Sequence, residues 1–269
     1  MVANVKELNA AQTELKKVSD LSGKSLQDYT DKAYKLGEVT GKTGTEMIDA
    51  ATQFKKMGYA DSDSLQLASI ATKFQNIADT EISAGTAASF INSQMKAFNI
   101  EAGESEHIID AVNNAANNFG VGTNDLQSAL TKTGAALSTT GNSYEETIGL
   151  VTAGTEILVG QSSKVGRGLR SISINMANAA KEADRFEGAN GKVNIALKDE
   201  EGNIRSTFDI MKDLAQGTKE GSVAWDELNN AEKTAVGSAL AGKTQFEVKV
   251  TPPCIEICMK NIDLIAEKS

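Results

Sequence analysis

The stretch Ser143-Tyr-Glu-Glu-Thr-Ile-Gly-Leu-Val-Thr-Ala-Gly-Thr-Glu-Ile-Leu158 decides the fold class. Ser143 and Glu146 match a capping box, in which the hydroxyl and the acid satisfy backbone N–H groups at the start of a helix. Residues at three- and four-residue steps after the cap are mostly apolar, so they share one face of a helix. That face consists of Tyr144, Ile148, Val151, Thr155 and Leu158.

The same signals recur along the chain. Apolar stripes at helical spacing run through residues 65–77, 108–119 and 169–180. Thr43 with Glu46 forms a second capping box, and Ser25 with Asp28 a weaker version. No proline interrupts the chain before Pro252. We therefore predict a mainly α fold, an array of short antiparallel helices.

One segment, residues 192–205, departs from the helical pattern. Val193, Ile195 and Leu197 alternate with polar residues, and the acidic turn Asp199-Glu-Glu-Gly202 follows. Alternation followed by a turn that ends in glycine is typical of a β-hairpin. We predict one small hairpin within the helical array.

The sequence also indicates an internal duplication. Ile48 aligns with Leu126 at an offset of 78, and Ile91 aligns with Ile172 at an offset of 81. Residues 30–98 and 108–179 would then be two copies of a helical unit that stack on their neighbours. Chance similarity between helices of low sequence diversity is the alternative.

Composition excludes several partners. The net charge is −9, so the chain lacks the excess of Lys and Arg that a binder of duplex nucleic acid needs. The same charge disfavours an anionic membrane surface. No stretch approaches the roughly 18 apolar residues of a membrane span. Aromatic residues make up only 5% of the chain, so the core must consist mostly of aliphatic side chains.

Few residues suggest catalysis. His107, the only histidine, lies at a predicted helix start, which favours a surface residue over a metal ligand. Cys254 and Cys258 are four apart but lack further ligands for a structural zinc site. The acid pairs 145–146 and 200–201 fall at a cap and a turn. We predict no catalytic residue, no cofactor and no metal site.

One stretch near the C-terminus matches a nucleotide-binding pattern. Gly237-Ser-Ala-Leu-Ala-Gly-Lys-Thr244 fits the bare Walker spacing. A phosphate-binding loop follows a strand, whereas residues 225–236 favour a helix. A nucleotide-binding P-loop at 237–244 is therefore the third of three hypotheses for function.

A basic stripe consists of Lys164, Arg167 and Arg170. It could contact an acidic partner, although a solvated helix face is the simpler interpretation.

The composition changes near the C-terminus. Both prolines and both cysteines lie between Pro252 and Cys258, and the residues before Pro252 contain neither type. Residues 246–269 therefore need an explanation separate from that of the main body.

Several stretches, in this order, resemble the core region of phage tail tape measure proteins, the type of long-tailed phages and prophages of Gram-positive bacteria. The resemblance covers about residues 25–245. The stretches are residues 122–136 with 143–153, residues 165–172, residues 199–205 with 208–214, and residues 235–245. In the family, the Ala-Gly-Lys turn at 241–243 closes a helical segment and binds no nucleotide.

The resemblance implies a structural protein of the virion tail, present in the host cytoplasm during assembly. It would lie in the tail lumen while tube subunits polymerise around it, and its length would set the tail length. The implied partners are the tail tube protein and tail-assembly chaperones, and an exposed apolar stripe would favour self-association. A non-enzymatic helical scaffold or interaction module is the alternative function.

The predicted organisation has three parts. Residues 1–24 form an N-terminal helix or leader, and residues 25–245 form the core-like helical region. Residues 246–269 depart from the family's pattern, in which helix continues past the Ala-Gly-Lys turn. We expect a truncated tape measure product whose last residues result from a frameshift, with fusion to unrelated sequence as the alternative.

Overall fold

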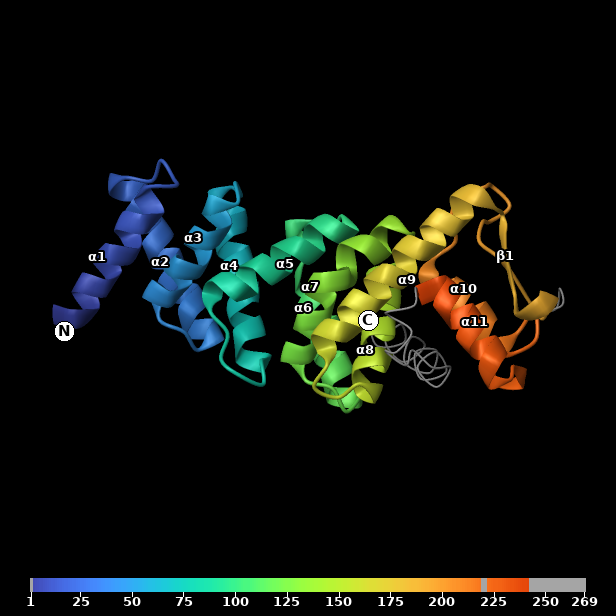
Figure 1. Ribbon diagram of the computed structural model, residues 1–269. Coiled ribbons are helices and arrows are strands. Elements are labelled where there is room, and N and C mark those ends of the chain that lie inside the picture. The colour runs from blue at the N-terminus through green and yellow to red at the C-terminus, as the bar shows by residue number, and fades with distance from the viewer. Residues whose placement is uncertain (1, 219–221, 242–269) are drawn as a thin grey trace. The chain divides into compact units, whose positions relative to one another are not determined.

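A computed structural model describes residues 2–218 and 222–241 (Figure 1). These residues form eleven α-helices and one two-stranded antiparallel sheet, which confirms the mainly α fold with a small hairpin. The chain divides into two compact units, with the boundary between Asp110 and Ala111. Helix α6 (Glu106–Asn118) runs across that boundary.

The first unit is entirely helical. After α5 a short 3₁₀ turn, Ala102–Glu104, leads into α6. The helices are α1 (Val2–Lys16), α2 (Gly23–Thr40), α3 (Gly44–Lys56), α4 (Asp61–Ile77) and α5 (Ala84–Phe98).

The second unit combines helices with the sheet. Strand β1 (Arg185–Gly188) follows α9, and β2 (Val193–Ala196) pairs with it in antiparallel register (Figure 1). The helices are α7 (Thr123–Thr139), α8 (Tyr144–Ile157), α9 (Ser162–Glu182), α10 (Thr207–Gln216) and α11 (Asn230–Ala241).

Two predicted capping boxes are confirmed, and one is wrong. Thr43 with Glu46 begins α3, and Ser143 with Glu146 begins α8. Ser25 is not an N-cap, because α2 begins earlier and Ser22 precedes its first residue. The Ser25 hydroxyl instead accepts a hydrogen bond from the Ser22 backbone N–H, at 3.0 Å.

Strand β2 pairs mainly with β1, which precedes it, and not with the strand predicted after the turn. Phe186 of β1 lies opposite Ile195 of β2, so the main ladder precedes the predicted turn in sequence. The turn at Asp199–Gly202 is present, and a single bridge joins Lys198 to Ile204 beyond it. Strand β1 has no alternating pattern, because the sequence Arg-Phe-Glu-Gly contains one large apolar residue.

Small side chains allow close packing between helices. In the second unit, a Cβ on Gly166 of α9 would lie 2.5 Å from the carbonyl oxygen of Ala129 in α7. In the first unit, the core includes Ala50, Ala51 and Ala68 beside larger aliphatic residues. Phe74 and Phe90 stack with ring centroids 5.0 Å apart. Backbones can therefore approach more closely than leucine-lined helices allow.

The predicted pairing of residues 30–98 with 108–179 stays a prediction, and the helices show a second correspondence near an offset of 100. Helices α2, α3 and α4 begin at residues 23, 44 and 61, and α7, α8 and α9 begin at 123, 144 and 162. Every buried residue of α2 and α3 has a buried counterpart 100 positions later. Both units thus contain the same three-helix set.

A tyrosine and a glycine occupy two corresponding positions in the two sets, in opposite order. In the first set, a Cβ on Gly44 would lie 2.4 Å from the ring of Tyr34, so glycine leaves space for the ring. The counterparts 100 positions later are Gly134 and Tyr144. Each set therefore has one tyrosine and one glycine at these two positions, in opposite order.

The predicted domain boundaries at residues 24 and 245 stay predictions. Helix α1 packs against α3, and its Leu15 is fully buried in the core of the first unit. Residues 246–269 lie outside the described residues.

We predict that Gly166→Ala lowers the free energy of unfolding by about 1–3 kcal/mol, because the new methyl group meets backbone that cannot rotate away. Urea denaturation measures the change. Gly85→Ala is the control, since the nearest atom to its Cβ would be 3.8 Å away and alanine favours helix. An equal loss in both variants would contradict the close packing.

We also predict a fall in stability at alkaline pH that depends on Tyr29. Burial raises the pKa of Tyr29 to about 12, against 10.0 for an ordinary tyrosine. The unfolded chain therefore loses this proton first, so stability present below pH 10 is lost as the pH rises towards 12.

The test compares the chain with Tyr29→Phe. The variant loses the 2.9 Å hydrogen bond between the Tyr29 and Ser64 hydroxyls, so it is less stable by about 1 kcal/mol at neutral pH. Above pH 10 the difference should shrink by about 1 kcal/mol per pH unit. A constant difference in urea titrations across this range would exclude the buried phenol as the cause.

Candidate functional site

The residues that the sequence singles out for chemistry do not converge. His107 lies partly exposed in the first turn of α6. Glu146 belongs to the cap of α8, and Glu200 and Glu201 lie exposed in the turn after β2. Among the described residues, no group of three or more His, Cys, Asp or Glu side chains could hold a metal ion.

The Walker-like pattern begins inside a helix. Gly237 to Ala241 belong to α11, which is preceded by the short 3₁₀ turn Trp225–Glu227. A phosphate-binding loop requires irregular backbone at these positions. Residues 242–244, which complete the pattern, lie outside the described residues, as do Cys254 and Cys258.

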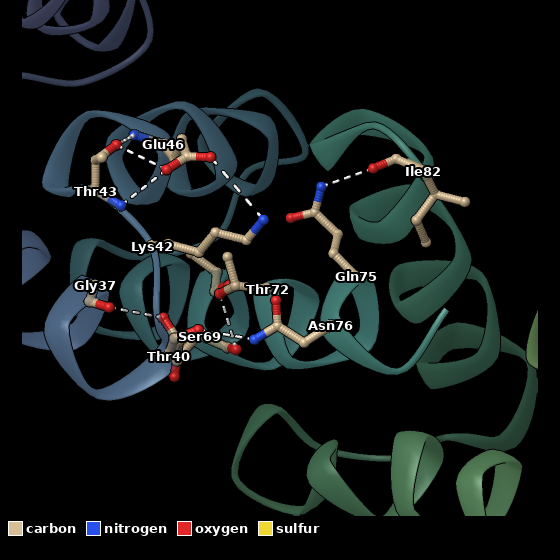
Figure 2. A network of polar contacts seen from close by, with 11 residues as sticks. Gly37, Thr40, Lys42, Thr43, Glu46, Ser69, Thr72, Gln75, Asn76 and Ile82 are labelled. Carbon is tan, nitrogen blue, oxygen red and sulfur yellow. Dashed lines mark hydrogen bonds and ion pairs between the residues drawn. The ribbon is translucent and has the colours of Figure 1, made fainter. Parts of the chain in front are cut away.

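A polar network stabilises the turn between α2 and α3 (Figure 2). The Thr40 hydroxyl donates to the Leu36 carbonyl oxygen, at 3.0 Å, at the end of α2. Gly41 follows with φ of +71°, a left-handed conformation that favours glycine. From α4, the Asn76 side-chain amide donates to the Thr40 carbonyl oxygen at 2.7 Å. The third helix of the set thereby holds the turn between the first two.

The corresponding turn between α7 and α8 repeats this chemistry. The Thr140 hydroxyl donates to the Leu137 carbonyl oxygen, at 3.0 Å, and Gly141 has φ of +76°. From α9, the Ser173 hydroxyl lies 2.8 Å from the Thr140 hydroxyl. Burial raises the pKa of Glu146 in the cap that follows, although the Ser143 backbone N–H opposes the shift.

Asn142 extends this second network to another helix. Its side-chain amide donates to the Leu137 carbonyl oxygen at 2.8 Å and to the Thr140 hydroxyl at 3.0 Å. Its side-chain oxygen accepts from the Phe208 backbone N–H, at 3.0 Å, in the first turn of α10. All of these groups are buried, so the network is structural.

The basic stripe on α9 is exposed. Lys164, Arg167 and Arg170 point away from the buried face, and Lys132 of α7 lies beside Gly166. Within the described part of the chain, these four cations form no ion pair, and α9 has a single acid, Glu182. The stripe is therefore available for an acidic partner.

The first unit contains a groove of about 750 Å³ between α2 and α4. Aliphatic side chains line its floor, and lysines and acids line its sides. The groove has no contiguous signal in the sequence, because most of its residues come from α2 and α4, about 40 positions apart, with Leu21 and Glu106 from outside these helices. The spacing of Lys32 and Lys35 beside Leu36 is the one local signal.

Comparison with known proteins identifies one family. A sequence model of the family described as phage-related minor tail protein matches residues 30–242. No solved structure matches the chain. No helix in the described ranges has the length and apolar character needed to cross a membrane.

We predict that Asn142→Ala lowers the free energy of unfolding by about 2–3 kcal/mol, because the buried Phe208 N–H and Leu137 carbonyl oxygen lose partners. The control is Lys42→Ala at the corresponding position of the first set. Lys42 makes a 3.9 Å ion pair with exposed Glu46, worth about 0–0.5 kcal/mol. Thermal unfolding of both variants measures the difference, and equal effects would exclude a structural role for the Asn142 network.

Proposed function

The chain belongs to the phage-related minor tail protein family, and from this premise we propose that it is a segment of a tape measure protein. Family membership makes the chain a structural component of a phage tail, located in the virion tail. The proposal adds that this segment takes part in setting the tail length during assembly.

Residue order supports the proposal. The stretches that resemble tape measure cores run from Gly122 to Gln245, and the family match covers most of this range. The described residues form short helices, and they bring together no group of three or more His, Cys, Asp or Glu side chains that could hold a metal ion. A structural role accounts for these features, and we propose no enzymatic activity.

A protein that sets the tail length must extend along the tail. The packing between these helices is compatible with their separation. Buried positions of α9 include Gly166, Gly168, Ser173 and Ala180. Small side chains bury less apolar area than leucine or phenylalanine, so separating such helices costs less free energy. We propose that the segment lies extended in the tube, where each helical residue adds about 1.5 Å.

The proposed partners follow from the role. The segment would contact the tail tube protein and tail-assembly chaperones in the host cytoplasm, and could self-associate before tube growth. Prophages of Gram-positive bacteria are the proposed source.

An in-frame deletion tests the length-setting role. Removing residues 123–182 from the tail gene that encodes this chain should shorten the tail by roughly 90 Å, at about 1.5 Å per residue. Electron microscopy of negatively stained virions measures the length. Replacing the deleted residues with an unrelated helical segment of equal length should restore it.

Unchanged tail length in virions that carry the deletion would contradict the ruler and leave the structural role. That result would favour the alternative, a helical scaffold or interaction module within the tail.

A further inference from the structure

The loop between β1 and β2 contains the one Asn-Gly pair of the sequence, Asn190-Gly191. Both residues are exposed, in the short 3₁₀ turn Ala189–Gly191. Within the described residues, the Asn190 side-chain amide has no hydrogen-bond partner. Glycine has no Cβ, so the Gly191 backbone nitrogen is open to approach. The pair therefore places an unrestrained amide next to an uncrowded backbone nitrogen.

The backbone of this turn is strained. Ala189 and Asn190 have φ of +51° and +57°, a left-handed conformation that costs free energy, above all for alanine. The ψ of Asn190 is 41°, which turns the Gly191 nitrogen away from the Asn190 side chain. Leaving this conformation relieves strain, and the glycines at 188 and 191 give the turn freedom to rotate. The rotation that brings the nitrogen to the side chain is therefore accessible in the folded protein.

Two other asparagines lack this combination. Asn142 is buried, and its side-chain amide donates to the Leu137 carbonyl oxygen at 2.8 Å. Asn203 is exposed like Asn190, but its side-chain amide donates to Asp199 Oδ2 at 3.2 Å. The residue after Asn203 is Ile204, whose branched Cβ crowds the backbone nitrogen. Asn203 thus shares the exposure of Asn190 without the unrestrained amide or the glycine.

We propose that Asn190 is a site of spontaneous deamidation in the folded protein, with water as the co-reactant. Hydroxide removes the proton of the Gly191 backbone nitrogen, which attacks Asn190 Cγ. The new N–Cγ bond closes a five-membered imide, the Cγ–Nδ2 bond breaks, and the amide nitrogen takes a proton from water and leaves as ammonia.

Water then opens the imide, adding OH to a carbonyl carbon and H to the nitrogen. Opening at the side-chain carbonyl gives aspartate, and opening at the main-chain carbonyl gives isoaspartate. No group is oxidised or reduced, and the hydroxide is regenerated.

The modification changes both the charge and the length of the hairpin loop. A carboxylate appears two residues before Lys192, whose ammonium pairs with Glu232 of α11 at 2.8 Å. Isoaspartate also adds one main-chain atom between Gly188 and Val193, which lie opposite each other in the β1–β2 register. The inference concerns this loop alone and does not rest on the proposed tail function.

Mass spectrometry of the full chain, incubated in mildly alkaline buffer, tests the proposal. Trypsin cleaves after lysine and arginine, so it releases residues 186–192 and residues 199–205, each with one asparagine. We expect the first peptide to gain the mass difference between OH and NH₂ about tenfold faster than the second, because only the first has glycine after asparagine. A sample digested before incubation measures any reaction during digestion.

The matched control variant is Asn190→Gln. It keeps an exposed amide at the same position, but attack by the Gly191 nitrogen would have to close a six-membered ring, which forms more slowly. The mass gain of residues 186–192 should therefore be lost. Circular dichroism confirms that both chains remain folded during the incubation.

The isomers of the product provide a second readout, because only the imide route gives isoaspartate. Chromatography should separate residues 186–192 into an aspartate form and an isoaspartate form. An unchanged mass of this peptide in the folded chain would overturn the proposal. So would an equally fast change in residues 199–205, an undiminished gain in Asn190→Gln, or the aspartate form without isoaspartate.

Discussion

The architecture depends on satisfying the backbone N–H and C=O groups at helix ends, where the chain reverses direction. Each helix leaves backbone N–H and C=O groups without intrahelical partners at its ends, and most helical stability in a protein comes from tertiary packing. Both three-helix sets meet this constraint at their first turn. A buried threonine, Thr40 or Thr140, bonds back to its helix, a left-handed glycine follows, and a capping box begins the next helix. The third helix reaches the same turn through Asn76 or Ser173.

One position distinguishes the two sets. Where α4 has Leu65, α9 has Gly166, and the glycine allows α9 to lie directly against the α7 backbone at Ala129. In the first set, Leu65 is one of the residues that line a groove between α2 and α4. The same helix position therefore carries a buried leucine in one set and a glycine at a close helix–helix contact in the other.

Local signals in the sequence predicted the features that local physics determines. The cap of α8 and the stripe from Tyr144 are confirmed, because capping and periodicity involve residues within a few positions of each other. Features formed by distant residues were missed. Strand β1 is stabilised by pairing with β2. The groove forms where α2 lies beside α4. The correspondence near an offset of 100 lies mainly in burial and turn geometry, since Leu65 and Gly166, 101 positions apart, are each the fifth residue of their helix without sharing chemistry.

Hydrogen exchange of the full chain, followed by mass spectrometry, tests most directly whether each three-helix set is one cooperative unit. The structure predicts that the central amides of α2, α3 and α4 exchange through one joint opening, with a common free energy, and that those of α7, α8 and α9 do the same. Independent rates for each helix, close to those of isolated helical peptides, would contradict the three-helix set as the unit of this fold.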